Sequence, residues 1–321
     1  MNEEVLHVGV LDKEVLFYTD PAPGKIIVDC TLGHGGHSLK ILEKLGCEGY
    51  LVGMDRDSRM LEAARKRIEA AHDSSTCAHV RLIHADHLQL PRVLQEALAD
   101  VPDAAPDGIL FDLGPSTPQL LAPERGMSWL SDQALDMRMD VSGPGPTAEE
   151  MVNEWTEEDL ARLFFENADE RWSRRIAQRI VEARAREPIR TGRQLAEIVE
   201  HAIPRKAWPP KIHVATRVFL ALRIEVNQEY RTLEAVLPMA FELLRPKGRL
   251  VVISFHSGED RRVKEFMRKM TTPPAVPWPY PQGNQQAPAR LLTKKPVTAS
   301  PEELAANPRS RSAKLRAIEK Y

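Results

Sequence analysis

The chain has 321 residues, which suits one large domain or a domain that carries an insertion. Its 44 basic and 46 acidic residues leave a net charge of −2, so overall charge argues neither for nor against a nucleic-acid partner. No apolar run reaches membrane-spanning length, and residues 1–5 hold no basic and apolar leader. We therefore expect a soluble, cytoplasmic protein with no membrane partner.

The cysteines are few and scattered. Cys30, Cys47 and Cys77 are odd in number and form no Cys-x-x-Cys pair. This pattern argues against a zinc site and against a disulfide framework, and it favours a reducing compartment. The sequence predicts no bound metal.

The first predicted unit is a buried strand over residues 25–28, a glycine-rich turn through His37, and a helix with apolar residues from Leu39 to Leu45. The acid at the strand end, Asp29, and glycines that let backbone N–H groups approach a ligand suit a nucleotide-like cofactor. The spacing departs from Gly-x-Gly-x-x-Gly. It looks more like the first motif of S-adenosylmethionine-dependent methyltransferases than a dinucleotide fingerprint.

A second predicted strand over residues 50–54 ends at Asp55. This acid falls about twenty residues after the glycine turn, where a carboxylate that binds ribose hydroxyls belongs. Such an acid indicates a nucleoside without saying which one. The alternative is that Asp55 caps the helix predicted over residues 58–68, since Asp is common at helix starts.

Three further apolar strands are predicted at residues 80–84, 108–111 and 249–254, with a helix over residues 90–98. Strands that alternate with helices predict an α/β fold with a doubly wound, Rossmann-like parallel sheet. The methyltransferase-like first motif indicates a sheet of the class I methyltransferase type. Ligands bind at the carboxyl ends of such strands. We expect the polar residues at these ends to converge on one crevice: Asp29, Asp55, Asp86, Asp112 and His256.

The alternation of strands and helices stops between the fourth and fifth strands, where helical signals such as the N-cap Thr156 replace it. We predict a cofactor-binding domain of residues 1–119 and 212–321 with a helical insertion, residues 120–211, as an RNA-recognition domain. Residues 171–193 hold eight arginines against two acids. That excess can neutralise phosphates, although an ordinary solvated helix face is the alternative.

The C-terminal third contains three further features. An apolar stripe predicts one long helix over residues 215–244 that returns the chain to the core. The proline-rich residues 273–281 predict an exposed loop. The basic residues 307–316 form either a second phosphate contact or a charged tail that serves solubility.

Several runs together resemble one family almost from end to end. The two most specific are Leu-Asp-Met-Arg-Met-Asp at residues 135–140 and Ile-Ser-Phe-His-Ser at residues 253–257, beside the glycine turn at 33–38, Asp55-Arg56-Asp57 and Asp112-Leu113-Gly114. In these runs the chain is similar to the bacterial 16S ribosomal RNA (cytosine-N4)-methyltransferases of the MraW/RsmH type. The resemblance implies S-adenosylmethionine as the cofactor. It also implies a cytidine in the decoding centre of the small ribosomal subunit as the target.

The resemblance also implies roles for individual residues. The implied cofactor contacts are Gly35, Gly36, His37, Asp55, His87, Asp112 and Gln119. The family has a phenylalanine where this chain has His87, whose imidazole can still stack on adenine. Related amino-methyltransferases place an acid or amide at the end of the fourth strand, so Asp112 and Ser116 are the candidate catalytic residues. Asp112 either accepts a hydrogen bond from the target amine or binds only the cofactor.

Arg138, Arg223 and His256 are candidate substrate contacts. The two arginines could equally be buried partners of Asp136, Asp140 or Glu225, and a lone histidine is more often structural than catalytic. Two other function classes stay open at this point. An NAD-dependent oxidoreductase would explain the glycine turn and Asp55, and a non-catalytic assembly factor would explain the RNA-binding features. The oligomeric state, monomer or homodimer, is open as well.

Overall fold

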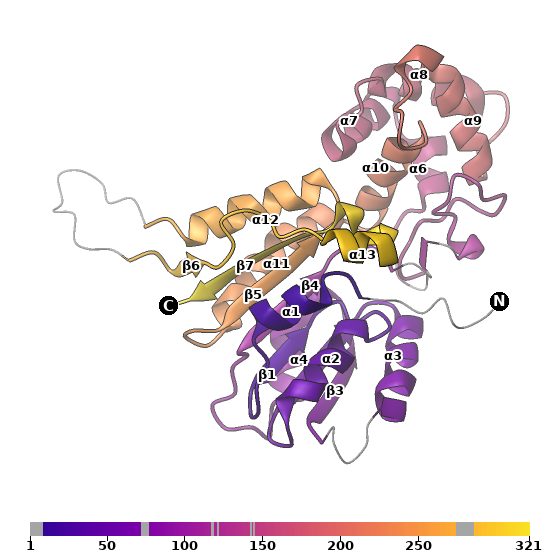
Figure 1. Cartoon of the computed structure of the whole chain (residues 1–321). Helices are drawn as coiled ribbons and strands as arrows, with labels where there is room; N and C mark the ends of the chain where they lie inside the picture. Colours follow the sequence, from indigo (N-terminus) through magenta and orange to yellow (C-terminus); the bar gives the residue numbers. More distant parts are fainter. Residues whose placement is uncertain are drawn as a thin grey trace. The chain divides into compact units, whose positions relative to one another are not determined.

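The computed structural model describes residues 9–71, 77–116, 119–120, 122–141, 143, 145–273 and 286–321. The chain divides into two compact units (Figure 1). Unit 1 is Met1–Gly114 with Thr232–Tyr321, and unit 2 is Pro115–Arg231. The insertion predicted over residues 120–211 falls within unit 2. Residues 212–231, which the sequence analysis assigned to the cofactor domain, also cluster with unit 2.

Unit 1 is built on a seven-stranded sheet with the strand order β3-β2-β1-β4-β5-β7-β6. Its strands are β1 (Ile26–Asp29), β2 (Tyr50–Asp55), β3 (His79–His84), β4 (Gly108–Asp112), β5 (Arg249–Ser254), β6 (Ala289–Leu291) and β7 (Lys314–Lys320). The first five strands pair in parallel, whereas β7 runs antiparallel to both β5 and β6. The predicted doubly wound α/β fold is confirmed.

Helices cover both faces of this sheet. The helical elements assigned to unit 1 or entering it are α1 (Asp12–Thr19), α2 (Gly36–Leu45), α3 (Ser58–Ala71), η1 (His87–Gln89), α4 (Leu90–Ala97), α11 (Glu229–Leu243), α12 (Ser257–Met270), α13 (Pro301–Ala306) and η4 (Pro308–Ser312). One apolar core joins α1, α2 and α3 to alternate strand residues such as Ile27 and Leu110. The other joins α4, α11 and α12 to their neighbours Val28 and Ile109. Because side chains alternate along a strand, both faces are buried.

Unit 2 is helical and has its own core. Its helices are η2 (Pro123–Arg125), α6 (Ala148–Glu154), α7 (Glu157–Ala168), α8 (Ser173–Arg184), α9 (Gly192–Ala202), η3 (Arg205–Ala207) and α10 (Thr216–Val226). Thr156 caps α7, since its hydroxyl accepts a hydrogen bond from the Asp159 N–H, as the sequence predicts. Phe164, Ile176 and Ile180 are fully buried, and they pack α7 against α8.

The prediction of one helix over residues 215–244 is wrong. Helix α10 ends at Val226, and α11 begins at Glu229. The Asn227 side chain accepts a hydrogen bond from the Met139 N–H and donates one to the Met137 carbonyl, both at 2.8 Å. Gln228 adopts a left-handed φ of 50°, which turns the chain. The apolar spacing continues across this break, so periodicity does not reveal it.

The basic residues 307–316 lead into the strand β7 of the sheet. Residues 308–312 form η4, and β7 begins at Lys314. Arg316 is buried and donates from Nε to Asp260 Oδ1 at 2.7 Å. The alternative of a tail charged only for solubility is therefore wrong for Lys314 and Arg316, which both pair with Asp260. The phosphate contact stays a prediction.

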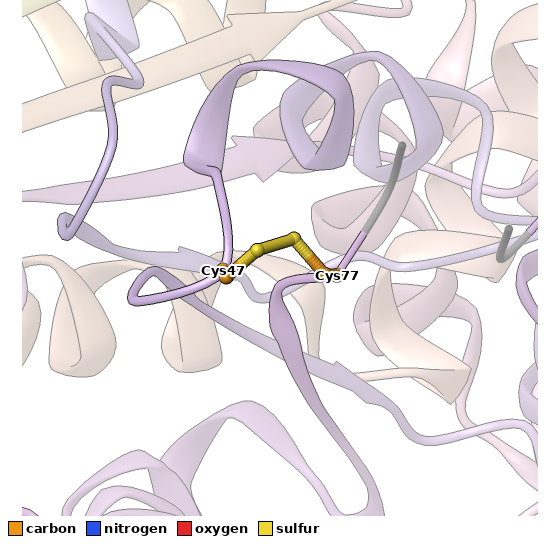
Figure 2. The surroundings of a disulfide bond; sticks show 2 residues. All are labelled: Cys47 and Cys77. Carbon is orange, nitrogen blue, oxygen red and sulfur yellow. A yellow bond between two sulfur atoms is a disulfide. The ribbon is translucent and has the colours of Figure 1, made fainter. Parts of the chain in front are cut away.

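A disulfide bond joins Cys47 to Cys77 (Figure 2). The prediction that the cysteines form no disulfide is therefore wrong, while Cys30 is free and buried. The parallel pairing of β2 with β3 brings the two cysteines close together. At the start of this pairing, the His79 N–H donates to the Gly49 carbonyl at 2.8 Å. This contact brings the turn after α2 beside the start of β3, and the two Cα atoms lie 4.5 Å apart.

None of the helices in the described ranges is long and apolar enough to cross a lipid bilayer. Two predictions concern residues outside these ranges. They are the absence of a leader at residues 1–5 and most of the proline-rich loop, from Pro274 onward.

Candidate active site

The turn between β1 and α2 depends on two glycines. Gly33 and Gly35 have φ values of 51° and 75°, in the left-handed region that favours glycine. From α3, the Arg67 side chain donates to the His34 carbonyl at 2.7 Å and holds the turn. Helix α2 begins directly at Gly36. The N–H groups in the first turn of a helix lack intrahelical partners, so this turn suits a polar or anionic ligand group.

Asp55 lies at the end of β2, against this turn. Its Oδ2 accepts from the Gly33 N–H and its Oδ1 from the Asp57 N–H, both at 2.8 Å. The alternative prediction, that Asp55 caps helix α3, is wrong. Asp57 takes that role, because its Oδ1 accepts from the Arg59 N–H at the start of α3. Each Asp55 oxygen keeps a further lone pair with which it can accept a ligand hydroxyl.

Burial raises the pKa of Asp55 to about 6. The carboxyl is therefore ionised above pH 6 and protonated below it, and an ionised carboxylate is the stronger acceptor for ribose hydroxyls. The resemblance implies S-adenosylmethionine as the ligand, and we expect the affinity for its demethylated form, S-adenosylhomocysteine, to be roughly tenfold weaker at pH 5 than at pH 7. Isothermal titration calorimetry across this range measures the effect.

The Asp55→Asn variant is the control, because its amide does not titrate. It should bind more weakly, with a flatter profile between pH 5 and 7. If the affinity of this variant fell between pH 7 and pH 5 as steeply as that of the wild type, the pH dependence would come from another acid.

Asp29 ties the turn to its neighbours. The carboxylate is buried, accepts from the Ser38 hydroxyl at 2.7 Å and accepts from the Thr31 N–H at 3.1 Å. Burial raises the pKa of Asp29. The Thr31 hydroxyl in turn accepts from the Asp112 N–H at 2.6 Å, which joins the ends of β1 and β4. Asp29 is thus a structural anchor of the site.

Asp112 faces a buried histidine. The Asp112 Oδ2 lies 3.5 Å from His37 Nε2, and the other ring nitrogen, Nδ1, lies 3.0 Å from Asp12 Oδ1. Burial by itself lowers the pKa of His37, but the two facing carboxylates of Asp112 and Asp12 outweigh it and raise the pKa to about 10. At neutral pH the ring is therefore an imidazolium between two carboxylates.

The second Asp112 oxygen, Oδ1, is buried and lacks a hydrogen-bond partner among the described residues. A buried acceptor without a partner is costly, so this oxygen suits a ligand that brings an N–H donor. Together with Asp55 on β2, Asp112 gives the edge of unit 1 acceptors for both hydroxyl and N–H groups.

His87 lies one turn after β3, in η1. Its ring contacts the Phe111 ring edge-to-face with centroids 5.8 Å apart. Burial lowers the pKa of His87, so the ring is neutral at physiological pH. Asp86 caps this turn by accepting from the Leu88 N–H at 3.0 Å. A neutral, partly buried aromatic ring at this place fits the predicted stacking role.

His256, at the end of β5, is the N-cap residue of α12. Its Nε2 lies 3.2 Å from Glu259 Oε1, and the buried Glu259 also accepts from the Phe255 N–H at 2.8 Å. Glu259 therefore holds the turn that carries His256. These local contacts agree with the structural alternative for this histidine, and a substrate contact stays a prediction.

In unit 2, the segment around Arg138 is fixed from several sides. Met137 has a left-handed φ of 64°, and the buried Arg125 donates to the Met139 carbonyl. Arg138 forms a two-pronged ion pair with Asp136, with distances of 2.9 Å from Nε and 2.8 Å from Nη2. This is one of the structural partners considered from the sequence. The guanidinium is partly exposed, so a substrate contact stays a prediction for Arg138.

The other candidates in unit 2 also have local partners. Arg223 donates to both carboxylate oxygens of Glu229, at 2.8 and 3.0 Å. Gln119 is buried, and its Oε1 accepts from the Ser116 N–H at 2.8 Å. The roles predicted for Ser116, Gln119 and Arg223 stay predictions.

Asp12 contacts His37, but its position in the sequence does not mark it as a site residue. It is the first residue of α1, outside every strand end and every motif used above. Only the packing of α1 beside α2 brings it to His37. The sequence carries no signal for this contact, because the two residues are far apart along the chain.

Comparison with known proteins identifies relatives along almost the whole chain. The model of the family described as "MraW methylase family" matches residues 4–321. The chain is 47% identical over 323 residues to "Ribosomal RNA small subunit methyltransferase H" of Syntrophotalea carbinolica, covering 99% of each chain. It is 46% identical over 318 residues to the protein of the same name from Geobacter sulfurreducens, covering 98% of each.

Proposed function

The chain belongs to the MraW methylase family, and from this we propose that it methylates N4 of one cytidine in the decoding centre of 16S ribosomal RNA, within the small ribosomal subunit. It is a methyltransferase, and its cofactor is S-adenosylmethionine. Family membership excludes the NAD-dependent oxidoreductase that the glycine turn and Asp55 left open. The observation that carries the proposal is the match to curated rRNA methyltransferases over nearly the full chain.

The side chains of unit 1 fit this cofactor. S-adenosylmethionine supplies a methyl group that its sulfonium has already activated, so the protein needs no nucleophile of its own. Asp55 offers acceptors for the ribose hydroxyls, and the ring of His87 can stack on adenine. The main contribution of the protein is orientation, which is worth roughly 7–11 kcal/mol when reacting groups are held in line.

Asp112 is our candidate for the residue that orients the target. The lone pair of the cytosine amine is delocalised into the ring, and an acceptor for one amine hydrogen helps to direct it toward the methyl group. The buried Oδ1 of Asp112, which lacks a partner among the described residues, supports this role. Ser116 is proposed as a second contact to the amine, from its position after the same strand.

Unit 2 is our candidate for the RNA-contacting part. Seven of the eight arginines between residues 171 and 193 are exposed: Arg171, Arg174, Arg175, Arg179, Arg186, Arg190 and Arg193. Arg179 and Arg193 form ion pairs with Glu182 and Asp132, at 2.8 and 2.6 Å. Exposed ion pairs of this kind are weak and can exchange for phosphates.

The test uses small-subunit particles that lack the modification. They are incubated with the protein and S-adenosylmethionine, and their nucleosides are analysed by mass spectrometry after digestion. We expect N4-methylcytidine at a single decoding-centre position, and none with the Asp55→Ala variant. Binding of both cofactor and particle without any methylated nucleoside would overturn the proposal in favour of a non-catalytic assembly factor.

A further inference from the structure

We propose that Asp12 is a positioning residue of the active site, which holds His37 against Asp112 and so fixes the Asp112 carboxylate. The inference rests on the proposed function, because Asp112 is the acceptor proposed there. It adds a residue from α1, an element that carries none of the cofactor or substrate residues named so far.

The geometry is that of an ion-pair chain. Asp12 Oδ1 lies 3.0 Å from His37 Nδ1, and His37 Nε2 lies 3.5 Å from Asp112 Oδ2. The three side chains come from the start of α1, the first turn of α2 and the end of β4. His37 is only 7% exposed, so water cannot readily replace these two carboxylates as partners of the ring. Tilting the ring away from Asp112 would leave a buried charge without its partner.

Asp12 is itself held in place. Lys40, one turn further along α2, contacts the second Asp12 oxygen. The Leu11 N–H donates to Glu303 Oε1 at 2.7 Å, which fixes the start of α1 from α13. A Cβ atom added at Gly9 would lie 2.1 Å from Asp12 Oδ1 and 3.1 Å from His37 Cε1. The backbone at Gly9 therefore packs directly against the Asp12–His37 pair.

The charges around His37 favour its protonated form. The facing groups are Asp12 from α1, Asp112 from β4 and Asp29 from β1, with Lys40 acting through Asp12. Both Asp12 and Asp112 raise the pKa of His37, to about 10, against the effect of burial. Since this folded value lies above the unfolded one of 6.5, the contribution to stability is complete below pH 6.5 and is lost as the pH rises through about 10.

Replacing Asp12 with a neutral residue should weaken the ion pair between His37 and Asp112. In Asp12→Asn, burial persists while one of the two carboxylates is gone, so the pKa of His37 should fall by about two to three units. Above that lower pKa the ring is neutral and no longer forms an ion pair with Asp112. Turnover at pH 8.5 should then be about tenfold below that of the wild type, with a smaller difference at pH 6.5.

The first measurement is a titration of His37 by NMR, with the signal assigned from the His37→Gln variant. We expect the wild-type ring to stay protonated through pH 9 and the Asp12→Asn ring to titrate at lower pH. Asp12→Glu keeps the charge and should preserve the wild-type value. Asp20→Asn, at the other end of α1, is the matched control and should also leave it unchanged.

A wild-type His37 that titrates near 6.5 overturns the inference even if Asp12→Asn fails to fold. So does an Asp12→Asn variant whose titration and pH profile of turnover match those of the wild type. The titration needs no methyl acceptor. A chain that does not methylate RNA would therefore refute the proposed function, while the titration would still decide whether Asp12 holds His37.

Discussion

Replacing Asp112 with alanine should lower the turnover of methyl transfer by about 10²-fold at saturating S-adenosylmethionine. The carboxylate is held by His37 at 3.5 Å, while the Asp112 N–H is held by the Thr31 hydroxyl at 2.6 Å. Its other oxygen is buried without a partner within the described ranges. An acceptor held in this way can orient an amine hydrogen, and its loss would leave the target amine free to rotate or shift.

Saturating cofactor separates the two roles that the sequence left open for Asp112. If the residue binds only the cofactor, Asp112→Ala raises the dissociation constant, and turnover recovers once the cofactor saturates. Single-turnover assays on small-subunit particles, with binding followed by calorimetry, distinguish the two cases. Asp100→Asn removes an exposed carboxylate and is the matched control. Full turnover by saturated Asp112→Ala would refute the orienting role.

Removing the disulfide by replacing both Cys47 and Cys77 with serine should lower the free energy of unfolding by about 3–4 kcal/mol relative to the oxidised chain. The bond closes a segment with a sequence separation of 30 residues. That segment includes β2 and α3, and with them Asp55. The cross-link restricts the unfolded chain, so its loss makes unfolding entropically more favourable.

Urea unfolding with and without a reductant measures this effect. The wild-type chain in dithiothreitol should have the same stability as the double-serine variant, whose own stability should not respond to the reductant. Cys30 is present in both proteins, so it cannot account for a difference between them. Equal stability of the oxidised and reduced wild-type chains would contradict the prediction.

The parallel strands were predictable because each is a short apolar run that ends in a polar residue. Residues 26–29 and 108–112 are buried strands with an acid at the end, and both lie within one residue of their predicted bounds. Asp55, our candidate for the acid that binds ribose, could be located for the same reason. These features are local, so the order of residue types along the chain is sufficient to find them.

Features set by contacts between distant residues were not predictable. Strand β7 carries four charged residues in seven, so its sequence does not predict a buried strand. The strand can be buried because Arg316 pairs with Asp260, which is distant in the sequence. The break after α10 depends on Asn227 reaching the backbone around Met137. The contact of Asp12 with His37 has the same origin, because the glycine turn marks His37 but no local pattern marks Asp12 as its partner.

The pairing of β4 with β5 has a consequence for the chain during its synthesis. All of unit 2 lies between Asp112 and Arg249, the end of one strand and the start of the other. At about 5–20 residues per second, a ribosome needs roughly seven to thirty seconds to cover that interval. Throughout this time the apolar edge formed by Ile109, Leu110 and Phe111 has no neighbour on one side. Nascent chains should therefore depend on chaperones that shield this edge, and translational pausing within unit 2 should increase aggregation.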